Sequence, residues 1–114
     1  MAVSSDIALA ETIREAALAV PGVAGISPGR RYVEATYGPG ITIRGIGVSR
    51  QHGRIRADVH VVAGVTPLPD LARRLREAIV AALQGATDVP VGAINLYIDD
   101  IALGDELTGG GHPG

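Results

Sequence analysis

The stretch RIRADVHVVAGVTPLPDLARRL, residues 54–75, decides the fold because it joins a strand to a helix. From residue 54 to residue 63 polar and apolar side chains alternate, which is the two-residue period of a half-buried strand. The apolar side comprises Ile55, Ala57, Val59 and Val61, and the polar side comprises Arg54, Arg56, Asp58 and His60. The sequence therefore predicts a strand with one face on a core.

A helix is predicted directly after this strand. Thr66 and Pro67 favour a helix start, since proline is tolerated in the first turn, where its missing N–H is not needed. Asp70 places negative charge near the positive end of the helix dipole. Apolar residues then recur at helical spacing on one side: Leu68, Leu71, Ala72, Leu75, Ile79, Ala82 and Leu83.

The rest of the chain extends outward from this strand–helix unit. A first helix is expected over residues 6–20, capped by Ser5 or Asp6 and ended by the Pro-Gly at 21–22. Short strands are expected at residues 23–27, 32–37 and 39–50, and RQHGRI predicts a hairpin turn with Gly53 in the left-handed conformation. In the last strand, residues 91–101, Ile94, Leu96 and Ile98 are predicted to face inward.

This order of elements predicts an α+β fold. The economical arrangement is a two-layer sandwich in helix–strands–helix–strand order, with a mixed sheet and both helices on one face. A chain of 114 residues is the size of one domain. We expect that domain to span residues 1–103, and residues 104–114 to form a flexible Gly-rich tail.

The composition narrows the possible functions. The absence of cysteine excludes disulfides, thiolate metal sites and cysteine nucleophiles. Charged residues interrupt the first twenty positions, which argues against a signal peptide, and no window has the apolar length of a membrane span. We therefore expect a cytoplasmic protein. His52, His60 and His112 form no ligand cluster, and neither G-x-G stretch leads directly into a helix, so no metal and no cofactor is predicted.

Asp58 and His60 are the strongest candidates for an acid–base pair, because they lie two residues apart on one side of the predicted strand. General acid–base catalysis also needs a cleft, a shifted pKa and a reacting group within hydrogen-bond reach. No serine-centred nucleophile motif lies nearby. We therefore predict a solvated polar face here, with no catalytic residue and no enzymatic activity.

The distribution of basic residues raises an alternative. All ten are arginines, and six of them fall within residues 30–56. Four could line the predicted hairpin and bind RNA or another phosphate ligand: Arg44, Arg50, Arg54 and Arg56. Glu34 and Asp58 interrupt this stripe, and few aromatic residues are present to stack on bases. Nucleic acid is therefore not the expected partner.

Four segments in order resemble the alkaline-shock (envelope stress response) protein family of bacteria. They are IALAETIREAALAVPGVAGISPG at 7–29, RIRADVHVVAGV at 54–65, LPDLARRLREAIVAAL at 68–83 and VGAINLYIDDI at 91–101. The resemblance covers residues 7–101 and follows the family's order of helix, PGV-type turn, variable loop, strand, helix and strand. It implies a small, cytoplasmic, non-enzymatic protein linked to cell-envelope homeostasis. Some members self-associate, and some are held at the membrane by a separate anchoring protein.

The polar sides of the two long strands form the candidate site. If both strands belong to one sheet, seven residues share its helix-free side: Arg54, Arg56, Asp58, His60, Asn95, Tyr97 and Asp99. Arginine and tyrosine often anchor protein interfaces, because each offers a large contact area with directional polar groups. We expect this surface to bind a protein partner or a second copy of the chain.

Overall fold

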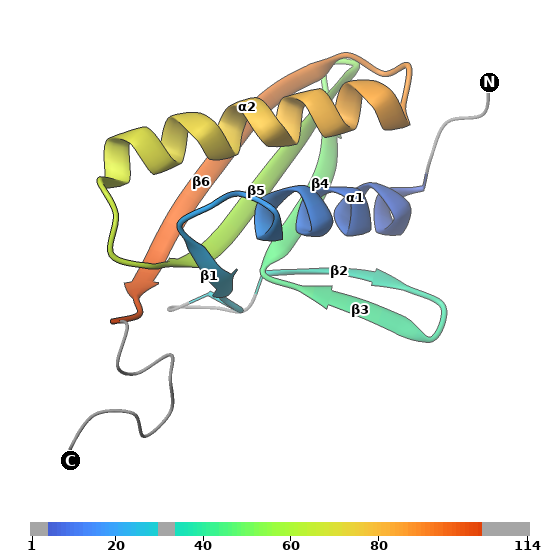
Figure 1. Cartoon of the computed structure of the whole chain (residues 1–114). Helices are drawn as coiled ribbons and strands as arrows, with labels where there is room; N and C mark the ends of the chain where they lie inside the picture. Colours follow the sequence, from blue (N-terminus) through green and yellow to red (C-terminus); the bar gives the residue numbers. More distant parts are fainter. Residues whose placement is uncertain (1–4, 30–33, 104–114) are drawn as a thin grey trace.

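The central strand, β5 (Arg54–Ala63), organises the computed structural model, which describes residues 5–29 and 34–103. Its odd-numbered residues from Ile55 to Ala63 are buried, as the two-residue period predicts. Two helices, α1 (Asp6–Leu18) and α2 (Leu68–Ala86), pack side by side on that face and leave the other face without a helix (Figure 1). The predicted two-layer α+β sandwich is confirmed.

Both edges of β5 are paired. β6 (Val91–Ile101) pairs with it in parallel, because the α2 crossover returns the chain in the same direction. β4 (Ile46–Gln51) pairs antiparallel along residues 54–59 of β5, and β1 (Val23–Ile26) pairs antiparallel along residues 61–63. β4 and β1 thus share one edge of β5, while β6 occupies the opposite edge.

His60 marks the point at which the neighbour of β5 changes from β4 to β1. Its backbone N–H donates to the Gly45 carbonyl at 2.8 Å, and its carbonyl accepts from the Ser27 N–H at 2.9 Å. Gly45 has a φ of +83°, and an added Cβ would overlap the Ser27 carbonyl oxygen and the Ile26 side chain. The junction therefore requires glycine at position 45.

The Gly- and Pro-rich segment forms a separate hairpin of β2 (Ala35–Gly38) and β3 (Ile41–Arg44). The predicted single strand over residues 39–50 is wrong at Gly45, whose left-handed backbone divides it into β3 and β4. Of the strand predicted at 32–37, positions 32 and 33 lie outside the described residues. The Thr36 hydroxyl donates to the Ile46 carbonyl at 2.7 Å, and Ile43 is buried, so the hairpin is fixed against the main sheet.

The core lies between the helices and the sheet. Six of the predicted core residues are buried, namely Leu71, Leu75, Ile79, Val59, Val61 and Ile94, and Leu96 and Ile98 pack against them while partly exposed. From α1, Leu9, Ile13 and Ala17 complete the cluster. Its small and medium aliphatic side chains allow a close approach of helix to sheet, as a chain without phenylalanine or tryptophan requires.

The predicted ends of the elements are close to those observed. The Ser5 hydroxyl caps α1 by accepting from the Ala8 N–H at 3.3 Å, and α1 ends at Leu18, before the predicted residue 20. His52 and Gly53 both have positive φ, so the β4–β5 turn is a two-residue loop with two left-handed positions, of which the sequence indicated only Gly53. The predicted tail at 104–114 lies outside the described residues.

The start of α2 is tied to the turn after α1. Asp70 accepts hydrogen bonds from Arg73 and Arg74, which hold the pKa of its carboxyl below the usual value. Arg74 also donates to the Pro21 carbonyl. The described residues contain two helices, α1 and α2, and neither is long and apolar enough to cross a membrane.

Candidate interaction surface

The structure brings all seven predicted residues onto one side of the sheet. Parallel register places Asp58 beside Asn95 and His60 beside Tyr97, and antiparallel register places Ser49 of β4 beside Arg56. We call this surface the helix-free face; from β5 and β6 it comprises Arg54, Arg56, Asp58, His60, Asn95, Tyr97 and Asp99. Whether it binds a partner remains a prediction.

Asp99 is the centre of one half of the helix-free face. One of its carboxylate oxygens, Oδ2, accepts from the Ser27 hydroxyl at 2.8 Å and lies 3.0 Å from Nδ1 of His60. The His60 ring stacks on Tyr97, with ring centroids 4.5 Å apart and planes 13° from parallel. His60 is only 7% exposed, so the predicted solvated face is wrong at this residue. Its ring is covered by Tyr97 and Asp99 of β6, which the pattern of β5 does not show.

Asp58 is the centre of the other half. Its Oδ1 accepts from the Asn95 side-chain amide at 2.9 Å and lies 3.6 Å from the Arg56 guanidinium. The carboxylate is partly buried, whereas the Arg56 side chain is 37% exposed. The Asp58–Asn95 contact is a cross-strand pair, whereas Arg56 and Asp58 lie on the same strand. Arg56 therefore presents its charge to solvent beside a carboxylate that β6 also holds.

The acid–base pair considered from the sequence does not form. Asp58 contacts Arg56 and Asn95, while His60 contacts Asp99. Ser27, which the sequence analysis did not single out, adds a hydroxyl to the second group. That hydroxyl donates to the Asp99 carboxylate, which in turn contacts the imidazole, so the three side chains do not have the Ser–His–Asp order of a catalytic triad. The arrangement joins β5 and β6 to the residue that directly follows β1.

The four hairpin arginines do not form one basic stripe. Arg50 lies on the helix side of β4, where its guanidinium is 3.4 Å from Asp6 of α1. Arg54 and Arg56 lie on the helix-free face, and Arg44 belongs to β3. Antiparallel register separates these residues, because alternate strand positions point to opposite faces. The alternative of a continuous phosphate-binding stripe loses its geometric basis.

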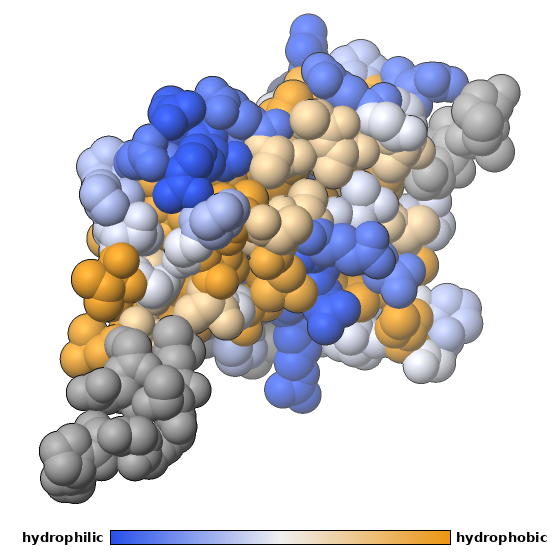
Figure 2. All heavy atoms as spheres, viewed as in Figure 1, coloured by the Kyte–Doolittle hydropathy of each residue, from blue (hydrophilic) through white to orange (hydrophobic). Residues whose placement is uncertain are grey.

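Two observations bear on other ligands and contacts. Within residues 5–29 and 34–103, no three histidine, aspartate or glutamate side chains are grouped closely enough to hold a metal ion. Figure 2 shows hydrophobic side chains gathered over the β5–α2 connection and the end of β6, where Val65, Ile101 and Leu103 are exposed. That small apolar patch adjoins the edge of the sheet.

Comparisons with known proteins show a similar fold but assign the chain to no family. No protein-family model and no curated protein matches the chain. The fold is similar to that of the MamM CTD in its copper form, with a TM-score of 0.51, 21% sequence identity, and coverage of 87% of this chain and 89% of that one. It is also similar to a point variant of the MamM CTD, with a TM-score of 0.52, 18% identity, and coverage of 88% and 94%. At these identities the likeness concerns the fold alone.

Proposed function

We propose that this chain is a non-enzymatic interaction module whose helix-free face binds a second copy of the chain. The observation that carries the proposal is that hydrogen bonds already order the polar side chains of that face, while one large aromatic side chain stays exposed. Asp58, Asn95 and Asp99 are held by hydrogen bonds within the face, while Tyr97 remains 42% exposed. Side chains that are already ordered lose less entropy on binding, and exposed tyrosine and arginine side chains are both enriched at interface centres.

A second copy suits the charges of the helix-free face. Arg54 and Arg56 carry positive charge, and Asp58 and Asp99 carry negative charge on the same surface. A two-fold axis brings the same surface of two subunits together, so a surface with both signs can be complementary to itself. Arg54 forms no ion pair with any other described residue, and its charge is available across such an interface.

We expect the double substitution Arg56→Ala and Tyr97→Ala to weaken self-association at least tenfold. Both residues expose large polar and aromatic area on the helix-free face. Loss of the Tyr97 stacking on His60 costs about 0.5–1.5 kcal/mol, which a stable domain tolerates. Analytical ultracentrifugation over a concentration series measures association, and circular dichroism checks folding.

A matched control makes the same chemical change elsewhere. Arg73 is exposed on α2 and Tyr37 is 73% exposed on β2, so their joint replacement by alanine removes one arginine and one tyrosine outside the helix-free face. This control is expected to associate as the original chain does. Equal association of a folded Arg56→Ala, Tyr97→Ala variant would place the interface elsewhere, and a wild-type chain that stays monomeric at millimolar concentration would contradict self-association.

We further propose that the module acts in the cell-envelope stress response, as the alkaline-shock family does. The support is the sequence resemblance over residues 7–101, with its four segments in the family's order. In this role the chain works in the cytoplasm and reaches the membrane through an anchoring protein. Deleting its gene in the source organism is expected to impair growth after alkaline or cell-wall stress, and growth identical to that of the parent strain would contradict the role.

A further inference from the structure

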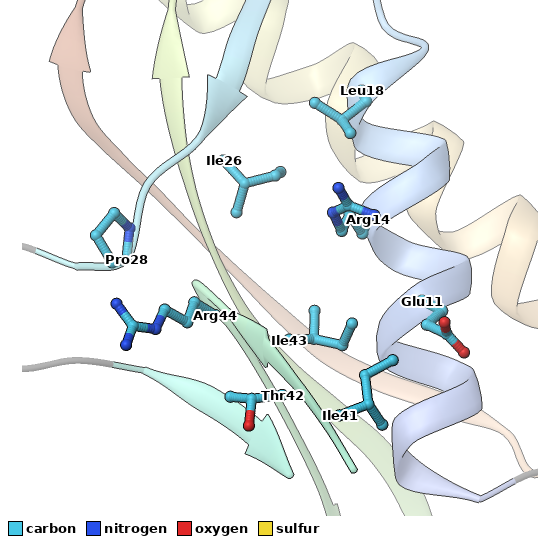
Figure 3. Close-up of a pocket in the computed structure, with 9 residues that line it drawn as sticks. All are labelled: Glu11, Arg14, Leu18, Ile26, Pro28, Ile41, Thr42, Ile43 and Arg44. Atoms are coloured by element: carbon cyan, nitrogen blue, oxygen red, sulfur yellow. The ribbon is translucent and has the colours of Figure 1, made fainter. Parts of the chain in front are cut away.

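A groove of about 640 Å³ lies between α1 and the β2–β3 hairpin (Figure 3), and its lining includes none of the seven residues that define the helix-free face. One wall is α1 and another is the end of β1, while β3 lines the groove along its whole length. The lining residues are Glu11, Arg14, Leu18, Ile26, Pro28, Ile41, Thr42, Ile43 and Arg44.

The lining shows that the groove follows an edge of β3. Side chains of successive strand residues point to opposite faces, so a groove over one face would contact only every second residue. This groove contacts all four residues of β3, from Ile41 to Arg44. β2 occupies one edge of β3, and no further strand of the described residues pairs with the other. The groove therefore runs along the unpaired edge.

The pairing pattern identifies the backbone groups that face the groove. The Gly45 N–H donates to the Glu34 carbonyl at 2.6 Å, while the Glu34 N–H donates to the Pro28 carbonyl, so one hydrogen bond continues the β2–β3 ladder just beyond Arg44, at a hydrogen-bonded position. Hydrogen-bonded and non-hydrogen-bonded pairs alternate along an antiparallel ladder. Thr42 and Arg44 therefore fall in non-hydrogen-bonded pairs and direct their N–H and C=O groups away from β2. No other described element bonds to these groups.

The walls of the groove specify what could pair with this edge. Leu18 is 43% exposed and Ile41 39% exposed, so two aliphatic side chains remain open to an apolar neighbour. Arg14 and Arg44 form no ion pair with the other described residues, and Glu11 is the one acidic residue of the lining. Hydrophilic and hydrophobic residues lie next to one another over α1 and the hairpin in Figure 2. The groove combines apolar surface with an excess of positive charge.

We propose that an extended segment of a partner protein adds to β3 as a third strand of the hairpin sheet. Strand addition at an open edge supplies backbone hydrogen bonds, and pockets for alternate side chains supply selectivity. Here the apolar side chains of the segment face Leu18 and Ile41, and an acidic side chain on the opposite side pairs with Arg44. The partner segment therefore alternates apolar residues with polar ones and carries at least one carboxylate.

A labelled synthetic peptide, TVTVEVT, is the probe for this site. Its valines alternate with polar residues, and its glutamate lies on the polar side. Fluorescence anisotropy measures its affinity for the full chain. Amide NMR is expected to show the largest shifts, and new protection from hydrogen exchange, at Thr42 and Arg44. A peptide that shows no binding at millimolar concentration, or one that shifts amides of β6 instead, would overturn the proposal.

Thr42→Pro tests the backbone contact directly. Proline removes the outward N–H and is tolerated at outward positions of an edge strand, so we expect at least tenfold weaker peptide binding by a folded protein. Tyr37→Pro is the matched control, since Tyr37 pairs with Thr42 and its N–H points to the opposite edge of the hairpin. Equal binding by wild type and Thr42→Pro would contradict strand addition.

A charge exchange tests the site without changing the backbone. The peptide TVTVKVT is expected to bind the wild-type chain at least threefold more weakly than TVTVEVT, because its lysine faces Arg44. Arg44→Glu is expected to reverse this preference. If the folded Arg44→Glu protein still preferred TVTVEVT over TVTVKVT, Arg44 would not contact the charged residue of the peptide, and the proposed charge pairing would be wrong. These peptide measurements are independent of the helix-free face, so their failure leaves the self-association proposal untouched.

Discussion

Replacement of Leu75 by alanine is expected to lower the free energy of unfolding by about 2–5 kcal/mol. Leu75 is fully buried in the middle of α2, where the helices meet the sheet. Alanine removes apolar area from the core and leaves a cavity that the neighbouring side chains fill only in part. Urea denaturation followed by circular dichroism measures the loss.

Glu77→Ala is the matched control for this core substitution. Glu77 lies on the same helix with its side chain 65% exposed, and its ion pair with Arg73 is also exposed. Such a pair contributes at most about 1 kcal/mol, so the control is expected to stay close to the original stability. A loss below about 1 kcal/mol for Leu75→Ala would show that Leu75 does not belong to a close-packed core.

Replacement of Gly45 by alanine is expected to have the other large effect. The φ of +83° alone costs a non-glycine residue about 1–3 kcal/mol. In addition, the new Cβ overlaps the backbone oxygen of Ser27, and backbone atoms cannot move aside as a flexible side chain can. The β1–β4 junction must therefore shift, and thermal unfolding is expected to begin at a clearly lower temperature.

Gly53→Ala separates these two causes. Gly53 has a similar φ of +75°, but no atom lies within 4 Å of an added Cβ. Its replacement incurs the backbone strain without the overlap, so the loss of stability is expected to be smaller than for Gly45→Ala. Equal losses for the two variants would mean that the close approach to Ser27 contributes nothing.

The long elements could be predicted from the sequence because their patterns are local. The alternation over residues 54–63 gives β5 its bounds, and the helical spacing after Pro67 gives α2 its buried side. The division of residues 39–50 into two strands could not be predicted in the same way. Gly40 has a positive φ in open space and Gly47 lies close to the Glu34 side chain, so Gly45 differs from both only in combining a positive φ with the close approach of the Ser27 backbone.

The sequence predicted which residues of β5 and β6 share the helix-free face, but it did not predict which of their side chains are buried. Strand periodicity places the seven residues on one side of the sheet once β5 and β6 are paired in register. The His60 ring is covered by Tyr97 and Asp99, of which Asp99 lies 39 residues further along the chain. A pattern within one strand carries no information on which distant segment covers its polar side, so His60 was predicted to face water.

The shared edge of β5 has a consequence for the order in which the fold assembles. β4 and β5 are joined by a two-residue turn, so their pairing closes a very short loop. The pairing of β1 with residues 61–63 closes a much longer loop, which contains β2, β3 and β4. Long loops close more slowly, so we expect β1 to join after the β4–β5 hairpin has formed. With its four residues, β1 also has few bonds to lose. We therefore expect the same strand to open first in the native state, and its departure would carry Ser27 away from Asp99.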